Sequence, residues 1–172
     1  AQIALAKKDI PAARGFLQGE NKLIKKYGCD EVRYFSTLAL LYQELNEFDS
    51  LVATYLNGIT AAEKSGDYYG LGRASSNLAS AFLQAGQQEK AIQYFQKALE
   101  AARKQTKAPA LAATIETKFS EVYLELYRSF GKKAHADSAL LLATNALESA
   151  KKYQDLITYL EALKTLSLHA YM

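Results

Sequence analysis

The chain has 172 residues, of which 49% are apolar and 23% are charged, so it can bury the core of a globular domain. Its 21 basic and 18 acidic residues leave a net charge of only +3, which argues against nucleic acid as a direct partner. The single cysteine, Cys29, excludes an intrachain disulfide and a multi-cysteine zinc site. The apolar runs are far shorter than the roughly 20 residues of a membrane-spanning helix. We expect a soluble protein without membrane insertion by this segment, and its compartment, cytoplasmic or periplasmic, is left open.

Helical periodicity runs along the whole chain, and no segment keeps the apolar/polar alternation of a strand for long. The two prolines, Pro11 and Pro109, stand where helices can begin. Gly66 is expected to close a helix in the left-handed conformation. The fold class is therefore predicted to be all-α, with helices at residues 12–27, 31–45, 48–65, 68–85, 88–105, 109–128, 136–153 and 155–171.

The chain resembles itself when it is shifted along its own sequence. A shift of 40 residues pairs Arg33 with Arg73, and a shift of 48 pairs Ala91 with Ala139. The third copy is longer than the others, so we expect a lengthened turn around residues 129–135. These pairings predict a single array that stacks its repeats on one another. Its expected parts are a partial repeat at 1–29, repeats at 30–67, 68–107 and 108–154, and the first helix of a further repeat at 155–172.

The best-preserved copy runs from Gly72 to Lys107. Its spacing of small and large residues resembles the tetratricopeptide repeat (TPR), although Ser75 replaces the first aromatic residue. The preceding copy has Asn46 and Gly58 where glycine and alanine are usual. The resemblance implies a right-handed α–α superhelix of antiparallel helix hairpins. It rests on Leu78, Ala79, Phe82, Gly86, Ala91, Phe95 and Ala98.

The copy spacing, at 40 residues or more, resembles the longer TPR variants of bacterial regulators, including those fused to sensor histidine kinases. In TPR proteins the first helix of each hairpin lines a concave groove. The resemblance therefore implies a partner-binding groove formed by Arg33, Ser36, Thr37, Gln43, Arg73, Ser76, Asn77, Ser80, Gln84, Lys118 and Glu121.

Arg33 and Arg73 stand one copy apart and Lys118 could join them. Two guanidinium groups so spaced would hold an extended acidic segment through bidentate pairs. The alternative is that both are solvated or pair with Glu31 and Glu44, as exposed charges on helices usually do.

No catalytic, cofactor or metal site is predicted. Cys29 has no base placed beside it by a motif, and His135 and His169 lack the spacing of metal ligands. An acid/base pair of Glu121 and Glu125 is the enzymatic alternative, but such pairs are common on ordinary helices. We expect a non-enzymatic scaffold that binds a protein or peptide, within a larger bacterial signalling or regulatory protein. The alternative is a structural or self-association module without a peptide ligand, in which the terminal helices could form a homo-oligomer.

Overall fold

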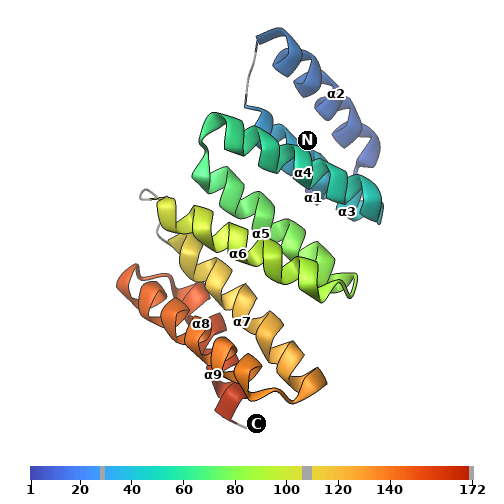
Figure 1. Ribbon diagram of the computed structural model, residues 1–172. Helices are drawn as coiled ribbons and strands as arrows, with labels where there is room; N and C mark the ends of the chain where they lie inside the picture. Colours follow the sequence, from blue (N-terminus) through green and yellow to red (C-terminus); the bar gives the residue numbers. More distant parts are fainter. Residues whose placement is uncertain (28–29, 106–109, 171–172) are drawn as a thin grey trace. The chain divides into compact units, whose positions relative to one another are not determined.

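A computed structural model of the chain describes residues 1–27, 30–105 and 110–170, so Cys29 and Pro109 lie outside the described residues (Figure 1). The described residues form helices and no strand, which confirms the all-α class. The predicted helices are confirmed to within a few residues at their ends, and α1 is an addition to them. The helices are α1 (Gln2–Ala6), α2 (Ile10–Tyr27), α3 (Glu31–Glu44), α4 (Phe48–Ser65), α5 (Tyr68–Gln84), α6 (Gln88–Lys104), α7 (Ala110–Phe130), α8 (Lys133–Lys152) and α9 (Leu156–Ala170).

The chain forms two compact units, Ala1–Leu78 and Ala79–Met172. In the first unit α3 packs against α4, and α1 contacts both α2 and α3. In the second unit α7 packs against α8, and α9 contacts both of these helices. The contacts of α1 with α3 and of α7 with α9 bring the first helices of successive hairpins together. Figure 1 shows the hairpin partners α3 and α4 lying side by side.

Each unit has its own apolar core. In the first, Ala4 and Leu5 of α1 are buried in a cluster with Leu17 of α2 and Leu41 of α3. A helix of five residues is too short to be stable alone, so this burial holds α1 in place. In the second, Phe95 of α6 stacks on Phe119 of α7 with ring centroids 5.4 Å apart.

In the described residues, the turns after α1, α3, α4, α5, α7 and α8 each place a residue in the left-handed conformation. Asn46 (φ 55°) and Gly86 (φ 72°) do so at equivalent places in two successive hairpins, which explains why asparagine replaces the usual glycine. The expected left-handed cap at Gly66 (φ 68°) is confirmed. Gly58 also departs from the usual alanine because α3 and α4 approach closely, and a Cβ there would lie 3.2 Å from the Cβ of Phe35.

The prediction of a lengthened turn around residues 129–135 is wrong. Helix α7 continues to Phe130 and α8 begins at Lys133, so only two residues separate them. Gly131 (φ 65°) provides the sharp reversal. The additional residues lengthen both helices instead, because Leu126 and Ala136 are buried and extend the contact between α7 and α8.

Three of the first helices begin with the same capping contact. A carboxylate oxygen of Asp30 accepts a hydrogen bond from the backbone N–H of Arg33 at 3.0 Å, and Asp67 accepts one from Gly70 at 2.9 Å. Asp155 caps α9 in the same way at 3.2 Å from the N–H of Thr158. These caps fix where α3, α5 and α9 start and thereby set the register of the residues that follow.

Candidate functional site

A pocket of about 260 Å³, here named the groove pocket, lies in the first unit between the first helices of successive hairpins. The sequence pattern predicted four of its lining residues as groove residues. They are Arg33, Ser36, Arg73 and Asn77. The described residues that line it are Gln2 of α1, Asp30, Val32, Arg33, Ser36 and Leu40 at α3, and Asp67, Tyr69, Gly70, Arg73 and Asn77 at α5.

The register of α3 and α5 brings these residues together. Both helices end at equivalent positions, Glu44 and Gln84, but α5 has 17 residues and α3 has 14. The additional N-terminal part of α5 contains Gly70, which lies against α3. A Cβ at Gly70 would lie 2.5 Å from Cγ1 of Val32 and would also collide with the carboxylate of Asp67. Glycine at this position therefore permits the close approach that forms the pocket.

The two arginines of the groove pocket are exposed. The guanidinium of Arg73 lies 5.6 Å from the ring centroid of Tyr69, which is within the range of a cation–π contact and orients the side chain. Within the described ranges, neither Arg33 nor Arg73 forms an ion pair with a carboxylate, Glu31 and Glu44 included.

The half-buried side chain of Asn77 is held in place by a residue of another helix. It is hydrogen-bonded to Tyr55, a buried residue of α4. Burial raises the pKa of the Tyr55 hydroxyl, while the Asn77 hydrogen bond and the charge of Arg73 lower it. The hydroxyl therefore remains protonated at neutral pH and fixes the amide that faces the pocket.

The predicted Thr37 is buried and does not line the pocket. Its hydroxyl donates to the carbonyl oxygen of Arg33 at 3.0 Å and lies 3.3 Å from Nε2 of Gln2, which donates to it. It therefore joins α1 to α3. By contrast Ser36, whose hydroxyl donates to the carbonyl oxygen of Val32 at 2.9 Å, does line the pocket.

The other predicted groove residues are not among the described residues that line the groove pocket. Gln43 is exposed in the last turn of α3, and Ser76 is buried. Ser80, Gln84, Lys118 and Glu121 belong to the second unit. The expected grouping of Lys118 with the two arginines would join residues of both units and stays a prediction.

Glu121 of the second unit lies near three other charged side chains. Partial burial and the charge of Glu161 raise the pKa of Glu121, and Lys164 and Lys118 oppose that shift. The nearest charges therefore come from α9 and from the preceding turn of α7. They do not single out Glu125 as a partner for acid/base chemistry.

The sequence pattern missed several residues of the site. Gln2 belongs to a helix too short to be recognised by periodicity, and Tyr69 lies in the N-terminal extension of α5. Asp30 and Asp67 could have been found, since an aspartate directly before a helical pattern is an N-cap signal. The support that Tyr55 gives to Asn77 depends on a contact between two helices and has no sequence signal.

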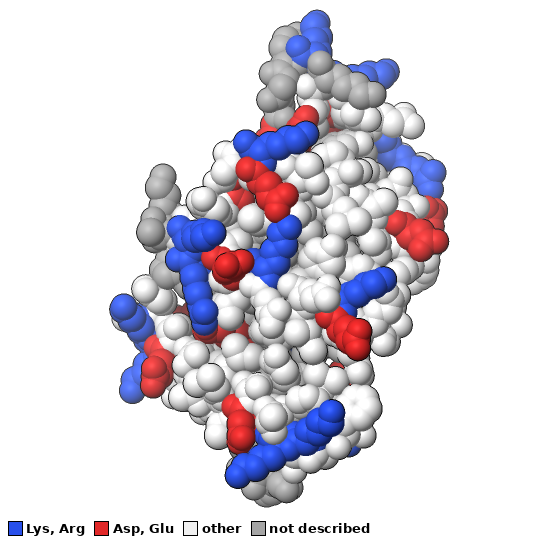
Figure 2. Space-filling model, in the orientation of Figure 1, with Lys and Arg blue, Asp and Glu red and all other residues white. Residues whose placement is uncertain are grey.

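Charge on the face shown in Figure 2 is mixed, with acidic side chains lying close to basic ones. In the described part of the chain, no group of three or more His, Cys, Asp or Glu side chains could hold a metal ion. None of its helices combines the length and hydropathy that crossing a membrane requires.

Successive helix hairpins, with a pocket lined by the first helix of each, are typical of a helical-repeat protein. The model of the tetratricopeptide repeat family matches residues 30–104, and the chain thus carries tetratricopeptide repeats over this region, as the residue spacing indicated. The fold is also similar to that of BtubC (BKLC) from P. vanneervenii, with a TM-score of 0.67 and 16% identity. That match covers 99% of this chain and 77% of the other. No curated protein gives a significant match.

Proposed function

We propose that this chain is a non-enzymatic protein-interaction module whose groove pocket binds an extended acidic segment of a partner protein. TPR regions generally mediate interactions between proteins, and the family match covers α3 to α6. The observation that carries the proposal is the presence of two guanidinium groups, Arg33 and Arg73, in one pocket without carboxylate partners among the described residues.

The other polar groups of the groove pocket suit an extended backbone. Asn77 offers a fixed amide, and Gln2 of α1 lines the same pocket. Asp30 and Asp67 already accept backbone N–H groups at the helix starts. Their negative charge disfavours ligand carboxylates directly beside them, whereas the positive charge of the two arginines favours such groups.

A peptide-library pull-down tests this assignment with the wild type and an Arg33→Ala/Arg73→Ala/Asn77→Ala variant. The variant should lose the acidic peptides that the wild type retains. A matched control, Lys22→Ala/Lys133→Ala, removes two exposed positive charges outside the pocket and should retain them. Equal capture by the wild type and the triple variant would reject the groove pocket as the binding site.

Salt dependence gives a second measurement on a selected acidic peptide. Bidentate pairs of arginine and carboxylate are weakened by screening, so its affinity should fall as salt rises from about 0.05 to 0.5 M. A peptide with glutamine in place of each glutamate should bind weakly at all salt concentrations. Unchanged affinity for the glutamine peptide would show that charge is not what the groove recognises.

We further propose that the module works within a larger bacterial regulatory protein. The spacing of 40 and 48 residues between copies, which resembles the longer TPR variants of such regulators, supports this context. A kinase or DNA-binding region encoded in the same gene would be the expected finding, and an unrelated metabolic enzyme there would contradict it.

Self-association is the alternative function, and one observation favours it. Helix α9 exposes Ile157 (72%), Leu160 (56%) and Leu163 (39%). Exposed apolar side chains at this spacing could pack against a second copy. Light scattering over a wide concentration range should then show dimers that an Ile157→Ser/Leu160→Ser variant cannot form. Monomers at all concentrations would exclude this alternative.

A further inference from the structure

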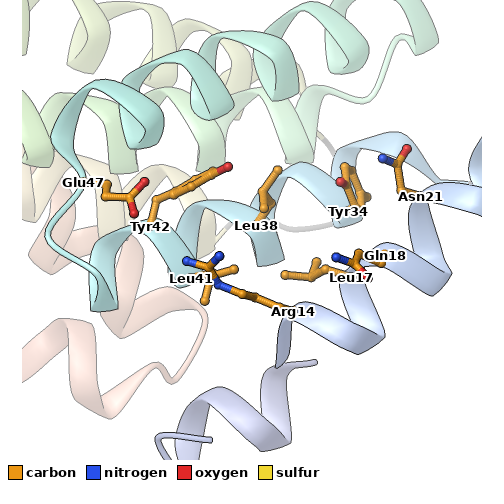
Figure 3. Close-up of a pocket in the computed structure, with 9 residues that line it drawn as sticks. All are labelled: Arg14, Leu17, Gln18, Asn21, Tyr34, Leu38, Leu41, Tyr42 and Glu47. Carbon is orange, nitrogen blue, oxygen red and sulfur yellow. The ribbon is translucent and has the colours of Figure 1, made fainter. Parts of the chain in front are cut away.

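A second cavity, of about 290 Å³, lies in the first unit between α2 and α3 (Figure 3). We name it the α2–α3 pocket. It shares no lining residue with the groove pocket, because α3 presents Arg33, Ser36 and Leu40 to one and a different face to the other. The lining residues are Arg14, Leu17, Gln18 and Asn21 of α2, Tyr34, Leu38, Leu41 and Tyr42 of α3, and Glu47 in the turn before α4.

One part of the α2–α3 pocket is apolar. Leu17 (3% exposed) and Leu41 (4% exposed) belong to the core of the first unit, and the half-buried Leu38 packs against the same cluster. An apolar group placed against these three leucines would extend an existing core. Burial there would stabilise binding by about 25 cal/mol for each Å² of apolar surface removed from water.

The lining of the α2–α3 pocket includes one positively and one negatively charged side chain. Arg14 comes from α2 and Glu47 from the turn after α3, and both are exposed (Figure 3). Over residues 1–27, 30–105 and 110–170, Arg14 forms no ion pair with Glu47 or with any other carboxylate. The Glu47 carboxylate accepts a hydrogen bond from the hydroxyl of Ser50 at 3.2 Å, through Oε2. A ligand that carries both charges could therefore satisfy both residues at once.

Neutral hydrogen-bonding groups complete the lining. Gln18 and Asn21 bring amides from α2, and Tyr34 and Tyr42 bring hydroxyl groups from α3. Burial raises the pKa of Tyr34, and the neighbouring Tyr42 and Glu20 add to that shift. The Tyr34 hydroxyl therefore stays protonated at neutral pH and can donate to a ligand oxygen.

We propose that the α2–α3 pocket binds a free apolar α-amino acid, with its carboxylate at Arg14, its ammonium group at Glu47 and its side chain against the leucines. The cavity volume lies just below the range of about 300–1,000 Å³ that is usual for drug-sized ligands, which suits a smaller ligand of this kind. A zwitterion with an apolar side chain matches each part of the lining. An apolar carboxylate without the ammonium group would leave Glu47 unpaired.

Titration of the full chain with L-leucine, followed by amide chemical shifts in NMR spectra, tests the proposal. Leucine should shift the signals of α2 and α3 residues around the pocket in a saturable way. Three probes remove one feature each: 4-methylpentanoate lacks the ammonium group, 3-methylbutylamine lacks the carboxylate and glycine lacks the side chain. Each should bind about tenfold more weakly or worse, as expected for the loss of one charge-assisted hydrogen bond or of the apolar contact.

Matched variants test the proposed roles of Arg14 and Glu47 in binding the two charged groups of the ligand. Arg14→Gln and Glu47→Gln should each weaken leucine binding about tenfold or more, and Arg14→Gln should leave the weak binding of 3-methylbutylamine unchanged. Lys22→Gln and Glu44→Gln make the same charge changes at exposed positions of α2 and α3 outside the pocket, and should bind leucine as the wild type does.

Each contrary result overturns a stated part of the proposal. Absence of saturable shifts with leucine would overturn the site, and equal affinity for leucine and 4-methylpentanoate would overturn the role of Glu47. Equal weakening by the control variants would show that overall charge decides binding. Because Arg33 and Arg73 are not involved, failure of the acidic-peptide experiment would leave this test unaffected.

Discussion

Arg103 of α6 donates a hydrogen bond to Glu116 of α7, with 3.2 Å between Nη2 and Oε1, and the two side chains of this ion pair lie in very different surroundings. The Glu116 side chain is 7% exposed and that of Arg103 is 61% exposed. Burial raises the pKa of Glu116, and the hydrogen bond and charge of Arg103 lower it without cancelling the effect of burial. The folded protein therefore holds a proton on Glu116 more readily than the unfolded chain does.

The free energy of unfolding should depend on pH through the protonation of Glu116. An acid whose pKa is raised on folding contributes stability below its unfolded pKa, about 4.3 for glutamate, and loses that contribution as pH rises through the folded pKa. Glu116→Gln keeps the shape without the buried charge. We expect its free energy of unfolding to equal or exceed that of the wild type at pH 7, with a smaller difference near pH 4.5. Urea unfolding at both pH values measures this, and a marked loss at pH 7 would contradict it.

Removal of the arginine should have the opposite effect. Arg103→Ala leaves Oε1 of Glu116 without its donor in a buried place, which should cost about 1–3 kcal/mol of unfolding free energy at pH 7. The cost should shrink near pH 4.5, where Glu116 takes up a proton. Arg128→Ala, at an exposed position of α7, is the control and should change stability by less than about 0.5 kcal/mol. A pH-independent loss would indicate that packing of the arginine side chain is what matters.

The stacked pair of Phe95 and Phe119 should dominate the core of the second unit. Phe95 is 1% exposed, so Phe95→Ala removes a fully buried ring and should cost about 3–5 kcal/mol. Phe130, at the end of α7, is 60% exposed, and Phe130→Ala should change stability by less than about 1 kcal/mol. Thermal unfolding followed by circular dichroism compares the two. Similar losses would show that the core does not depend on this stack.

Two glycines inside helices should respond in opposite ways to the same substitution. Gly70→Ala places a methyl group against Val32 and the capping carboxylate of Asp67, so we expect a loss of stability and weaker binding in the groove pocket. Gly19 of α2 has no atom within 4 Å of its added Cβ, and Gly19→Ala should raise stability by up to about 1 kcal/mol through helix propensity. Urea unfolding measures both. A stabilising Gly70→Ala would show that α5 can shift without cost.

The hairpin pattern could be predicted because it depends on residues close together in the sequence. The helix ends near Asn46, Gly66 and Gly86 follow from left-handed turn residues beside periodic apolar positions. The turn around residues 129–135 could not, since those residues carry loop-like composition. Residues 129–130 and 133–135 are helical, and only residues 131–132 form the turn, because Leu126 and Ala136 are buried where α7 and α8 pack.

Part of the groove pocket could also be predicted. Arg33, Ser36, Arg73 and Asn77 were found because repeats place equivalent residues on equivalent helix faces. The prediction included Thr37, which is buried because the unforeseen helix α1 covers it through Gln2. The α2–α3 pocket had no signal, since its lining comes from two helices and a turn that share no motif.

The sequence by itself determined the all-α class, the hairpins and the TPR character of residues 30–104, because helical periodicity and small-residue spacing are local properties that stacking merely repeats. Only the tertiary structure decided which polar side chains are accessible. Accessibility depends on how far each neighbouring helix extends, as the longer N-terminus of α5 and the presence of α1 show. It likewise decided that Arg33 and Arg73 share a pocket with Gly70, where the absence of a side chain lets two helices approach.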